Sequence, residues 1–196
     1  MVMNLKEKII RDSLKLFSLK GFLNTSIHDI LDKTKTSKGG FYNHFKSKED
    51  LFFAVLSEAR RLWREKNLSG FDRTGKPVQK IKKLLENYFL TYLQDKKNLP
   101  GGCFFVTVSV ELDDQRPHLA KELNEGFKRL KAMVNRLLEE GKESGEIDAA
   151  VDTGEATELI FSAMLGASVM YGTSKSADSL RRIYSSIVNY LDGLAP

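Results

Sequence analysis

The sequence has few of the residues on which disulfides and metal sites depend. Its 196 residues include one cysteine, Cys103, and only three histidines. A single cysteine excludes an intramolecular disulfide and a multi-cysteine metal site. The histidines lie far apart, and none begins a ligand spacing such as His-x-x-x-His: His28, His44 and His118. We therefore expect no metal and no cofactor.

Long apolar segments are also absent. No run of about 18 apolar residues occurs, and the charged start of the chain is not followed by the apolar core of a signal peptide. We therefore expect a cytoplasmic protein with no membrane partner. Hydrophobic residues at 41% and charged residues at 29% are ordinary for a folded globular chain.

The common sequence motifs of enzymes are missing. There is no Gly-x-Ser-x-Gly motif, no phosphate-binding loop and no dinucleotide fingerprint. Cys103 stands in an apolar run that would raise its pKa, so a small buried hydrophobe is favoured over a nucleophile. We expect no enzymatic activity and no catalytic residue.

The positive charge is concentrated at the beginning of the chain. Residues 1–66 contain 14 Lys and Arg against 8 Asp and Glu, whereas the remainder is close to neutral, and the formal net charge is +5. A basic amino-terminal part joined to a near-neutral body indicates a polyanion as the partner of the first part alone.

Apolar residues recur every three to five positions along most of the chain, which predicts an all-α protein. Helices are expected over residues 4–20, from Ser26, from Ser37, from Ser47 for about five turns, from Pro77 to about Lys97, from Pro117 to about Gly145, over 152–173 and over 176–193. Residues 103–112 have the composition of a strand, but a single strand would have no partner, so we expect a short buried helix. Residues 1–50 would form a three-helix DNA-binding head, and residues 51–196 a larger helical body.

The segment from Ser37 to Phe45 carries the strongest functional signal. On a helical wheel, Phe41 and Phe45 form one apolar edge that would face the protein. The opposite edge carries almost no side-chain bulk, because it consists of Gly39, Gly40 and Asn43. Two adjacent glycines weaken a helix, so they mark either a loop or a close approach to a partner. A nine-residue rod with a bare edge fits the major groove of DNA.

The sequence resembles a known family. The residues that carry the resemblance are Leu14, Phe17, Lys20, Gly21, Phe22, Thr25, Ser26, Ile27, Ile30, Ser37, Lys38, Gly39, Tyr42, His44, Phe45, Ser47, Lys48, Glu49 and Leu51. In this order they look like the amino-terminal DNA-binding domain of the tetracycline-repressor (TetR) family. The sequence departs from the usual pattern at Lys35, Thr36 and Asn43.

The resemblance implies a homodimeric transcription repressor that binds an operator in double-stranded DNA. Phosphates would be held by Thr25, Ser37, Lys38, Tyr42, His44 and Lys48. Base edges would meet Gly39, Gly40 and Asn43, with Ser26 on the same surface. The body would enclose a cavity for a small apolar or aromatic effector, lined by Trp63, Tyr88, Tyr92, Phe104, Thr107, Phe127 and Met164. A four-helix dimer interface would use Leu159, Ala163, Ala167, Met170, Ile183, Ile187 and Leu191.

Other interpretations stay open from the sequence. Each cavity residue could be plain core packing, and Lys48 could be a solvated lysine. The protein could be a DNA-binding regulator without a small-molecule ligand, or an activator. A helical carrier of apolar ligands is a more remote alternative, and it would show no affinity for DNA.

Overall fold

The computed structural model describes residues 4–112 and 115–196, and every regular element within these ranges is helical. The α-helices are α1 (Leu5–Lys20), α2 (Ile27–Thr34), α3 (Lys38–Tyr42), α4 (Lys48–Asn67), α5 (Pro77–Asn87), α6 (Phe104–Leu112), α7 (Pro117–Glu143), α8 (Thr153–Ser174) and α9 (Ala177–Asp192). A 3-10 turn, η1 (Phe71–Arg73), precedes α5, and a π-helical turn, η2 (Tyr88–Tyr92), follows it. The predicted all-α fold is confirmed.

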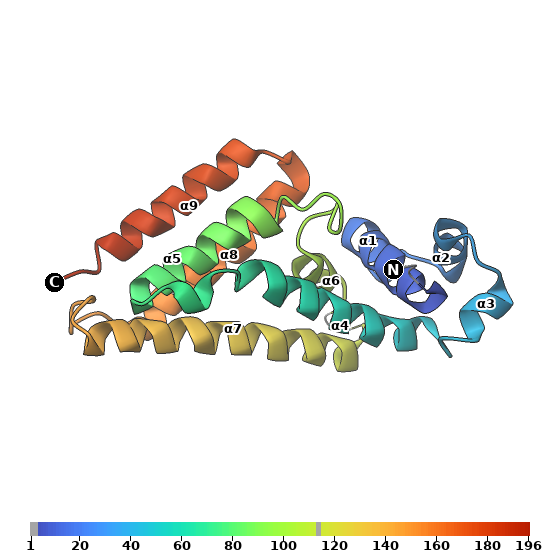
Figure 1. The fold of residues 1–196 in the computed structure, drawn as a ribbon, viewed down its shortest axis with the longest axis horizontal. Coiled ribbons are helices and arrows are strands. Elements are labelled where there is room, and N and C mark those ends of the chain that lie inside the picture. Colours follow the sequence, from blue (N-terminus) through green and yellow to red (C-terminus); the bar gives the residue numbers. More distant parts are fainter. Residues whose placement is uncertain (1–3, 113–114) are drawn as a thin grey trace.

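The molecule is elongated, with a small head at one end and a larger body at the other (Figure 1). The head contains α1, α2 and α3, and α3 forms its outer tip. Helix α4 leads from the head into the body without interruption, so it runs through the predicted domain boundary between residues 50 and 51. Helices α5 to α9 form the body, and α7 extends along much of its length.

Side-chain caps explain where several helices begin. Asn4 and Glu7 form a capping box at α1, and Ser26 and Asp29 form a second one at α2. The Ser47 hydroxyl accepts a hydrogen bond from the Asp50 amide at α4. Each cap satisfies backbone N–H groups that have no partner within the helix. The cap positions in the sequence therefore identify these helix starts correctly.

Aromatic rings in edge-to-face and tilted contacts join the head to the body. The Phe17 and Phe22 ring centroids lie 5.4 Å apart, and those of Phe22 and Phe52 lie 5.0 Å apart. Phe52 of α4 in turn lies 6.3 Å from Phe104 at the start of α6, and both rings are fully buried. The apolar core of the head is therefore continuous with that of the body.

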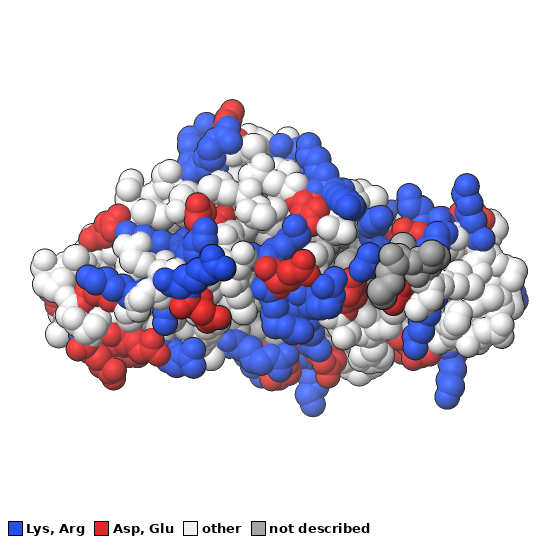
Figure 2. Space-filling model, in the orientation of Figure 1, with Lys and Arg blue, Asp and Glu red and all other residues white. Residues whose placement is uncertain are grey.

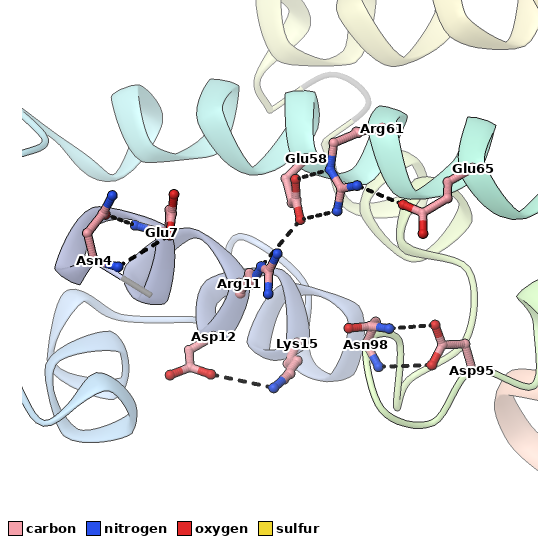
Figure 3. A network of polar contacts seen from close by, with 10 residues as sticks. All are labelled: Asn4, Glu7, Arg11, Asp12, Lys15, Glu58, Arg61, Glu65, Asp95 and Asn98. Carbon is pink, nitrogen blue, oxygen red and sulfur yellow. Dashed lines mark hydrogen bonds and ion pairs between the residues drawn. The ribbon is translucent and has the colours of Figure 1, made fainter. Parts of the chain in front are cut away.

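A chain of ion pairs supports the same junction on the surface, where α1 lies against α4 (Figure 3). Arg11 of α1 lies 3.6 Å from the Glu58 carboxylate, and Arg61 binds both Glu58, at 2.8 Å, and Glu65, at 2.7 Å. The hydrogen bond from Arg61 lowers the pKa of Glu58. Exposed ion pairs of this kind contribute little individually to stability. The buried aromatic contacts are therefore the main interaction that holds the head on the body.

Residues 103–112 are helical despite their strand-like composition. Phe104, Val106, Val108 and Leu112 are buried on several sides of α6, so tertiary packing outweighs the local β-propensity. The helix predicted from Pro77 to Lys97 is shorter than expected, because α5 ends at Asn87 and continues as the π-helical turn η2. Within the described ranges, no helix is both long enough and apolar enough to span a bilayer.

Candidate nucleic-acid interface and ligand cavity

Helix α3 is attached to the head by one apolar edge. Phe41 of α3 is fully buried, and Phe45, which follows the helix by three residues, is 3% exposed, so both predicted apolar rings face the protein. The Ser37 hydroxyl begins the helix by accepting a hydrogen bond from the Gly40 amide at 3.0 Å. Two anchoring rings and one cap are thus sufficient to hold a very short helix at the tip of the molecule.

The opposite edge of α3 faces solvent. Gly39, Asn43 and His44 are exposed, and the Tyr42 ring is 44% exposed although its edge contacts Phe41. A Cβ atom placed on Gly39 would have one neighbour within 4 Å, the Ser37 hydroxyl at 3.9 Å. The backbone at Gly39 can therefore be approached closely from outside.

Two features of this helix differ from the prediction. Helix α3 covers five residues instead of nine, because the chain turns at Asn43 to enter α4 at Lys48. Gly40 is half-buried and does not share the outward edge, since a Cβ atom there would lie 2.5 Å from the Thr36 hydroxyl. The bare edge therefore consists of Gly39 and Asn43.

Two predicted phosphate contacts have other partners in the structure. The Thr25 side chain is fully buried, and its hydroxyl donates to the Gly21 carbonyl at 2.6 Å. The Lys48 ammonium donates to the carbonyls of Phe22 and Thr25 at 2.8 Å and lies 3.4 Å from that of Leu23. All three of its protons are directed to these carbonyls, and burial lowers its pKa. The structure therefore gives Thr25 and Lys48 internal partners in place of the predicted phosphates, because the loop before α2 folds over the start of α4.

The other predicted polar contacts lie at the surface of the head. Ser37 and Lys38 are exposed, and so is Ser26, whose hydroxyl donates to Asp29 at 2.7 Å. The hydrogen bonds from Ser26 lower the pKa of Asp29. Lys and Arg side chains project from the head with some acidic groups between them, and both signs of charge are mixed over the visible face of the body (Figure 2).

The turn between α2 and α3 keeps the geometry of a helix-turn-helix although its sequence departs from the family pattern. Lys35 ends α2 in the left-handed region, with φ of 53°, a conformation that glycine adopts more easily. Its amide still donates to the α2 carbonyls of Leu31 and Asp32. A lysine at this position therefore gives the same C-cap that a glycine would give.

The body contains a cavity of about 320 Å³ between α4, α6, α7 and α8. Its lining is largely apolar and includes the predicted residues Trp63, Tyr88, Phe127 and Met164. The structure adds Phe105 and Phe161 to the predicted lining. The ring centroids of Phe127 and Phe161 lie 5.6 Å apart in an edge-to-face contact. A volume of this size is within the range of small-molecule sites.

Three predicted lining residues lie outside the cavity. Tyr92 is fully buried beside Tyr88, with its hydroxyl 3.9 Å from the Cys103 sulfur. Phe104 points to the head and packs on Phe52, and the Thr107 hydroxyl donates to the Cys103 carbonyl at 3.1 Å. The sequence could not separate Phe104 and Thr107 from Phe105, because α6 has apolar residues on every side.

Charged residues also border the cavity, and the sequence analysis missed them. Arg60 and Arg64 belong to α4, and Glu122 and Arg129 belong to α7. Arg60 donates to the Glu122 carboxylate at 3.1 Å and to its backbone carbonyl at 2.8 Å. Arg60, Trp63 and Arg64 are spaced so that they share one helix face. Since Trp63 was predicted to line the cavity, this spacing could have identified the two arginines as neighbours of the cavity.

Cys103 and the two tyrosines next to it are buried. Burial raises the pKa of the Cys103 thiol and the pKa of each phenol, Tyr88 and Tyr92. The Tyr88 hydroxyl shares a hydrogen bond with the Ser168 hydroxyl. All three groups are therefore uncharged at neutral pH. The described ranges contain no group of three or more His, Cys, Asp or Glu that could hold a metal ion.

A second apolar surface lies on α8 and α9. Four of the predicted dimer residues line a groove between these helices: Leu159, Ala163, Ile183 and Ile187. Leu159 is 53% exposed, and Met170 further along α8 is 52% exposed. Ala167 and Leu191 are 1% and 2% exposed, so they pack inside the subunit and are corrected to core residues.

Comparisons with known proteins cover both parts of the molecule. A family model described as "Bacterial regulatory proteins, tetR family" matches residues 9–55. A second one, described as "Tetracyclin repressor-like, C-terminal domain", matches residues 77–187. The two matched ranges reach from α1 to α9.

Individual relatives are similar over much of the chain. An uncharacterised HTH-type transcriptional regulator in the lacX 3' region of Lactococcus lactis subsp. lactis is 33% identical over 132 residues, which cover 67% of this chain and 66% of the relative. The chain therefore spans slightly less than two thirds of that protein. The HTH-type transcriptional repressor DhaR of Mycobacterium sp. (strain GP1) is 29% identical over 144 residues, which cover 72% of this chain and 69% of DhaR.

A solved structure shows the same fold over most of the length of both chains. The crystal structure of a TetR transcriptional regulator from Chloroflexus aurantiacus J-10-FL has a TM-score of 0.87 and 28% identity, covering 95% of this chain and 93% of that chain. The family model for the body alone spans more than half of the 196 residues. The chain therefore belongs to the tetR family of bacterial regulatory proteins.

Proposed function

We propose that this TetR-family protein is a ligand-responsive repressor that binds an operator in double-stranded DNA as a homodimer. The observation that carries the proposal is the combination of an exposed, nearly side-chain-free edge on α3 with a cavity in the body. The first feature fits a DNA groove, and the second fits a small effector. DhaR, which is similar over 72% of this chain, is itself named a repressor.

The backbone at Gly39 and the Asn43 amide would lie against base edges in the major groove. Asn can pair with an adenine edge through two hydrogen bonds, which makes Asn43 the main source of direct sequence readout on this edge. Ser37, Lys38, Tyr42 and His44 flank the bare edge and would contact phosphates, which set the register of the head without reading bases.

The apolar groove between α8 and α9 would pair with its copy in a second subunit. Leu159 and Met170 are about half exposed and need a partner surface, and Ile183 continues the same face on α9. A symmetric four-helix contact would place the two α3 helices in successive major grooves about 34 Å apart, which requires a near-palindromic operator.

The effector would bind in the cavity with its apolar part among the rings of Trp63, Phe127 and Phe161. Three arginines and one glutamate stand on the cavity walls, so the charge around the site is positive. An effector with an apolar or aromatic body and one acidic group would satisfy both parts of this lining. It would release the operator by favouring a head spacing that does not match the two half-sites.

Capture and sequencing of genomic fragments with the purified full-length protein would test the DNA part of the proposal. We expect a near-palindrome whose half-sites lie one helical turn, about 10 base pairs, or a multiple of it apart. Random duplex DNA of the same length serves as the control and should bind more weakly and with strong salt dependence. Equal affinity for captured and random DNA would contradict sequence-specific regulation.

The ligand part is tested by titrating the complex with paired small molecules. A naphthalene carboxylate and the corresponding neutral alcohol have the same apolar body and differ in charge. We expect the acid to lower operator affinity more strongly than the alcohol at equal concentration. Unchanged operator affinity across a panel of acidic and neutral aromatic molecules would count against an effector of this class.

A further inference from the structure

Helix α6 contacts both functional parts of the subunit. At its start, Cys103, Phe105 and Val106 form part of the cavity wall, while Phe104 between them packs on Phe52 of α4. Near its other end, Glu111 reaches the head. The helix has nine residues, so the two ends are only about 13 Å apart. A displacement of the cavity wall would therefore move Glu111 as part of the same rigid element.

Glu111 binds the loop between α1 and α2 of the head. Its carboxylate accepts hydrogen bonds from the amides of Phe22, at 2.6 Å, and Leu23, at 3.3 Å, and from the Asn24 side chain at 3.0 Å. Hydrogen bonds to an ionised carboxylate are about twice as strong as neutral ones. This contact joins residues that are almost 90 positions apart in the sequence.

The backbone of the loop is shaped to receive this carboxylate. Gly21 has a φ of 80°, which disfavours any residue with a Cβ atom. A Cβ atom on Gly21 would also lie 1.8 Å from a Glu111 carboxylate oxygen. The glycine therefore serves two purposes, since it ends α1 and leaves room for a side chain from the body.

Lys48 holds the same loop from the other side. Its ammonium binds the carbonyls of Phe22 and Thr25, whereas Glu111 binds the amides of Phe22 and Leu23. The loop thus lies between a negative group on its N–H side and a positive group on its C=O side. Lys48 lies in the first turn of α4, within the head, so Glu111 is the member of the pair that comes from the body.

We propose that Glu111 is the positioning residue through which α6 sets the orientation of the DNA-binding head according to the state of the cavity. The inference rests on the proposed function, because it assumes that cavity occupancy changes operator affinity. It adds the specific contact that carries the change: a carboxylate at one end of the helix whose other end forms the cavity wall. Two sites are coupled when one structural element differs between their two states.

The proposal can be tested without knowing the natural effector, by filling the cavity with a side chain. Gly126 of α7 lines the cavity, and a Cβ atom there has no neighbour within 4 Å. Gly126→Phe places a ring into the cavity and imitates occupancy. The operator affinity of four proteins is then measured by fluorescence anisotropy on a captured duplex: wild type, Gly126→Phe, Glu111→Gln and the double variant.

We expect Gly126→Phe to change operator affinity about tenfold in the wild-type background, a typical coupling between two sites. In the Glu111→Gln background we expect less than a twofold change. A tenfold change in both backgrounds would overturn the role of Glu111 and leave the proposed function intact. No change in the wild-type background would instead overturn release through the cavity, and the role of Glu111 with it.

Glu49→Gln provides the matched control. Glu49 of α4 also bridges head and body, through Arg116 at 3.4 Å and His118 at 3.1 Å, but it does not involve α6 and its partners are about half exposed. We expect Glu49→Gln to leave the tenfold response unchanged.

Thermal unfolding is recorded for every protein to show that each variant is folded. If Glu111→Gln is unfolded at the assay temperature, Glu111→Asp, which keeps the charge, replaces it in the cycle. With Glu111→Asp we expect a response between those of wild type and of an uncoupled protein, and a full tenfold response would contradict the proposal.

Discussion

Replacing Gly39 with leucine separates the folding of the head from its binding to DNA. Gly39 is exposed, and the Ser37 hydroxyl at 3.9 Å is the one neighbour that a new Cβ atom would meet within 4 Å. Leucine is a better helix former than glycine by up to about 1 kcal/mol, so Gly39→Leu should keep or slightly raise the stability of the head. On the bound operator, however, the leucine side chain would occupy the space in which the base edges must lie.

The loss of operator affinity can be worked out from the contacts that would no longer form. Each good base contact contributes about 1–3 kcal/mol of discrimination, and a dimer presents the bare edge twice. Loss of one contact of about 2 kcal/mol in each half-site gives about 4 kcal/mol, or roughly a thousandfold weaker binding. Affinity for random DNA should change little, because it depends on phosphate contacts.

Fluorescence anisotropy with a captured duplex and a scrambled duplex measures both affinities, and circular dichroism measures helix content. Ser57→Leu adds the same side chain at an exposed position of α4 and should bind the operator like wild type. If Gly39→Leu were folded and bound the operator within about threefold of wild type, well short of one lost base contact, α3 would not enter the groove in the proposed way.

Three further results are expected. Tyr42→Ala should weaken binding to all duplexes alike, whereas Asn43→Ala should change mainly the preference among operator variants in a competition series, and the reverse pattern would exchange their roles. Phe104→Ala should lower the free energy of unfolding by about 3–5 kcal/mol in a urea titration, because it leaves a cavity between head and body, and a loss below about 1 kcal/mol would contradict this packing. Burial raises the pKa of the Cys103 thiol, so its alkylation by iodoacetamide at pH 8 should be slower than that of a free thiol and should become faster as the pH rises. A rate equal to that of the free thiol would show that Cys103 is an accessible thiolate.

The sequence predicted the parts of the fold that depend on local chemistry. Caps at Ser26, Ser37 and Ser47 place three helix starts correctly, because each hydroxyl satisfies a backbone amide three residues later. A helical wheel over residues 37–45 separates the buried rings Phe41 and Phe45 from the exposed Gly39 and Asn43, although α3 itself ends at Tyr42.

Contacts between distant segments were not predictable in the same way. Lys48 stands in the first turn of a helix, where a solvated or phosphate-binding lysine is expected, yet its ammonium donates to carbonyls of the loop before α2. Phe104 and Phe105 are adjacent and chemically identical, but one joins the head and the other lines the cavity. Only the packing of α6 between head and body distinguishes them.

The same internal contacts determine how strongly DNA binding should depend on salt. Several cations of the head are used within the protein: Lys8 donates to the Thr34 carbonyl, Lys20 lies 3.0 Å from Asp29, and Lys48 is held by the loop. Lys6 lies over the Phe45 ring, 5.8 Å from its centroid. Among the described residues, the exposed lysines of the head that have no such side-chain partner are Lys33, Lys35, Lys38 and Lys46.

If these lysines alone meet phosphates, a dimer neutralises about eight, and the logarithm of the binding constant should fall with the logarithm of the salt concentration with a slope of about −7. Anisotropy titrations on random duplex DNA between 50 and 200 mM salt, about the range in which such slopes are usually resolved, measure it directly. A slope near twice this value would show that the internally held cations also reach the phosphates. The loop between Glu111 and Lys48 would then have to open on DNA, which contradicts its role as a fixed contact between body and head.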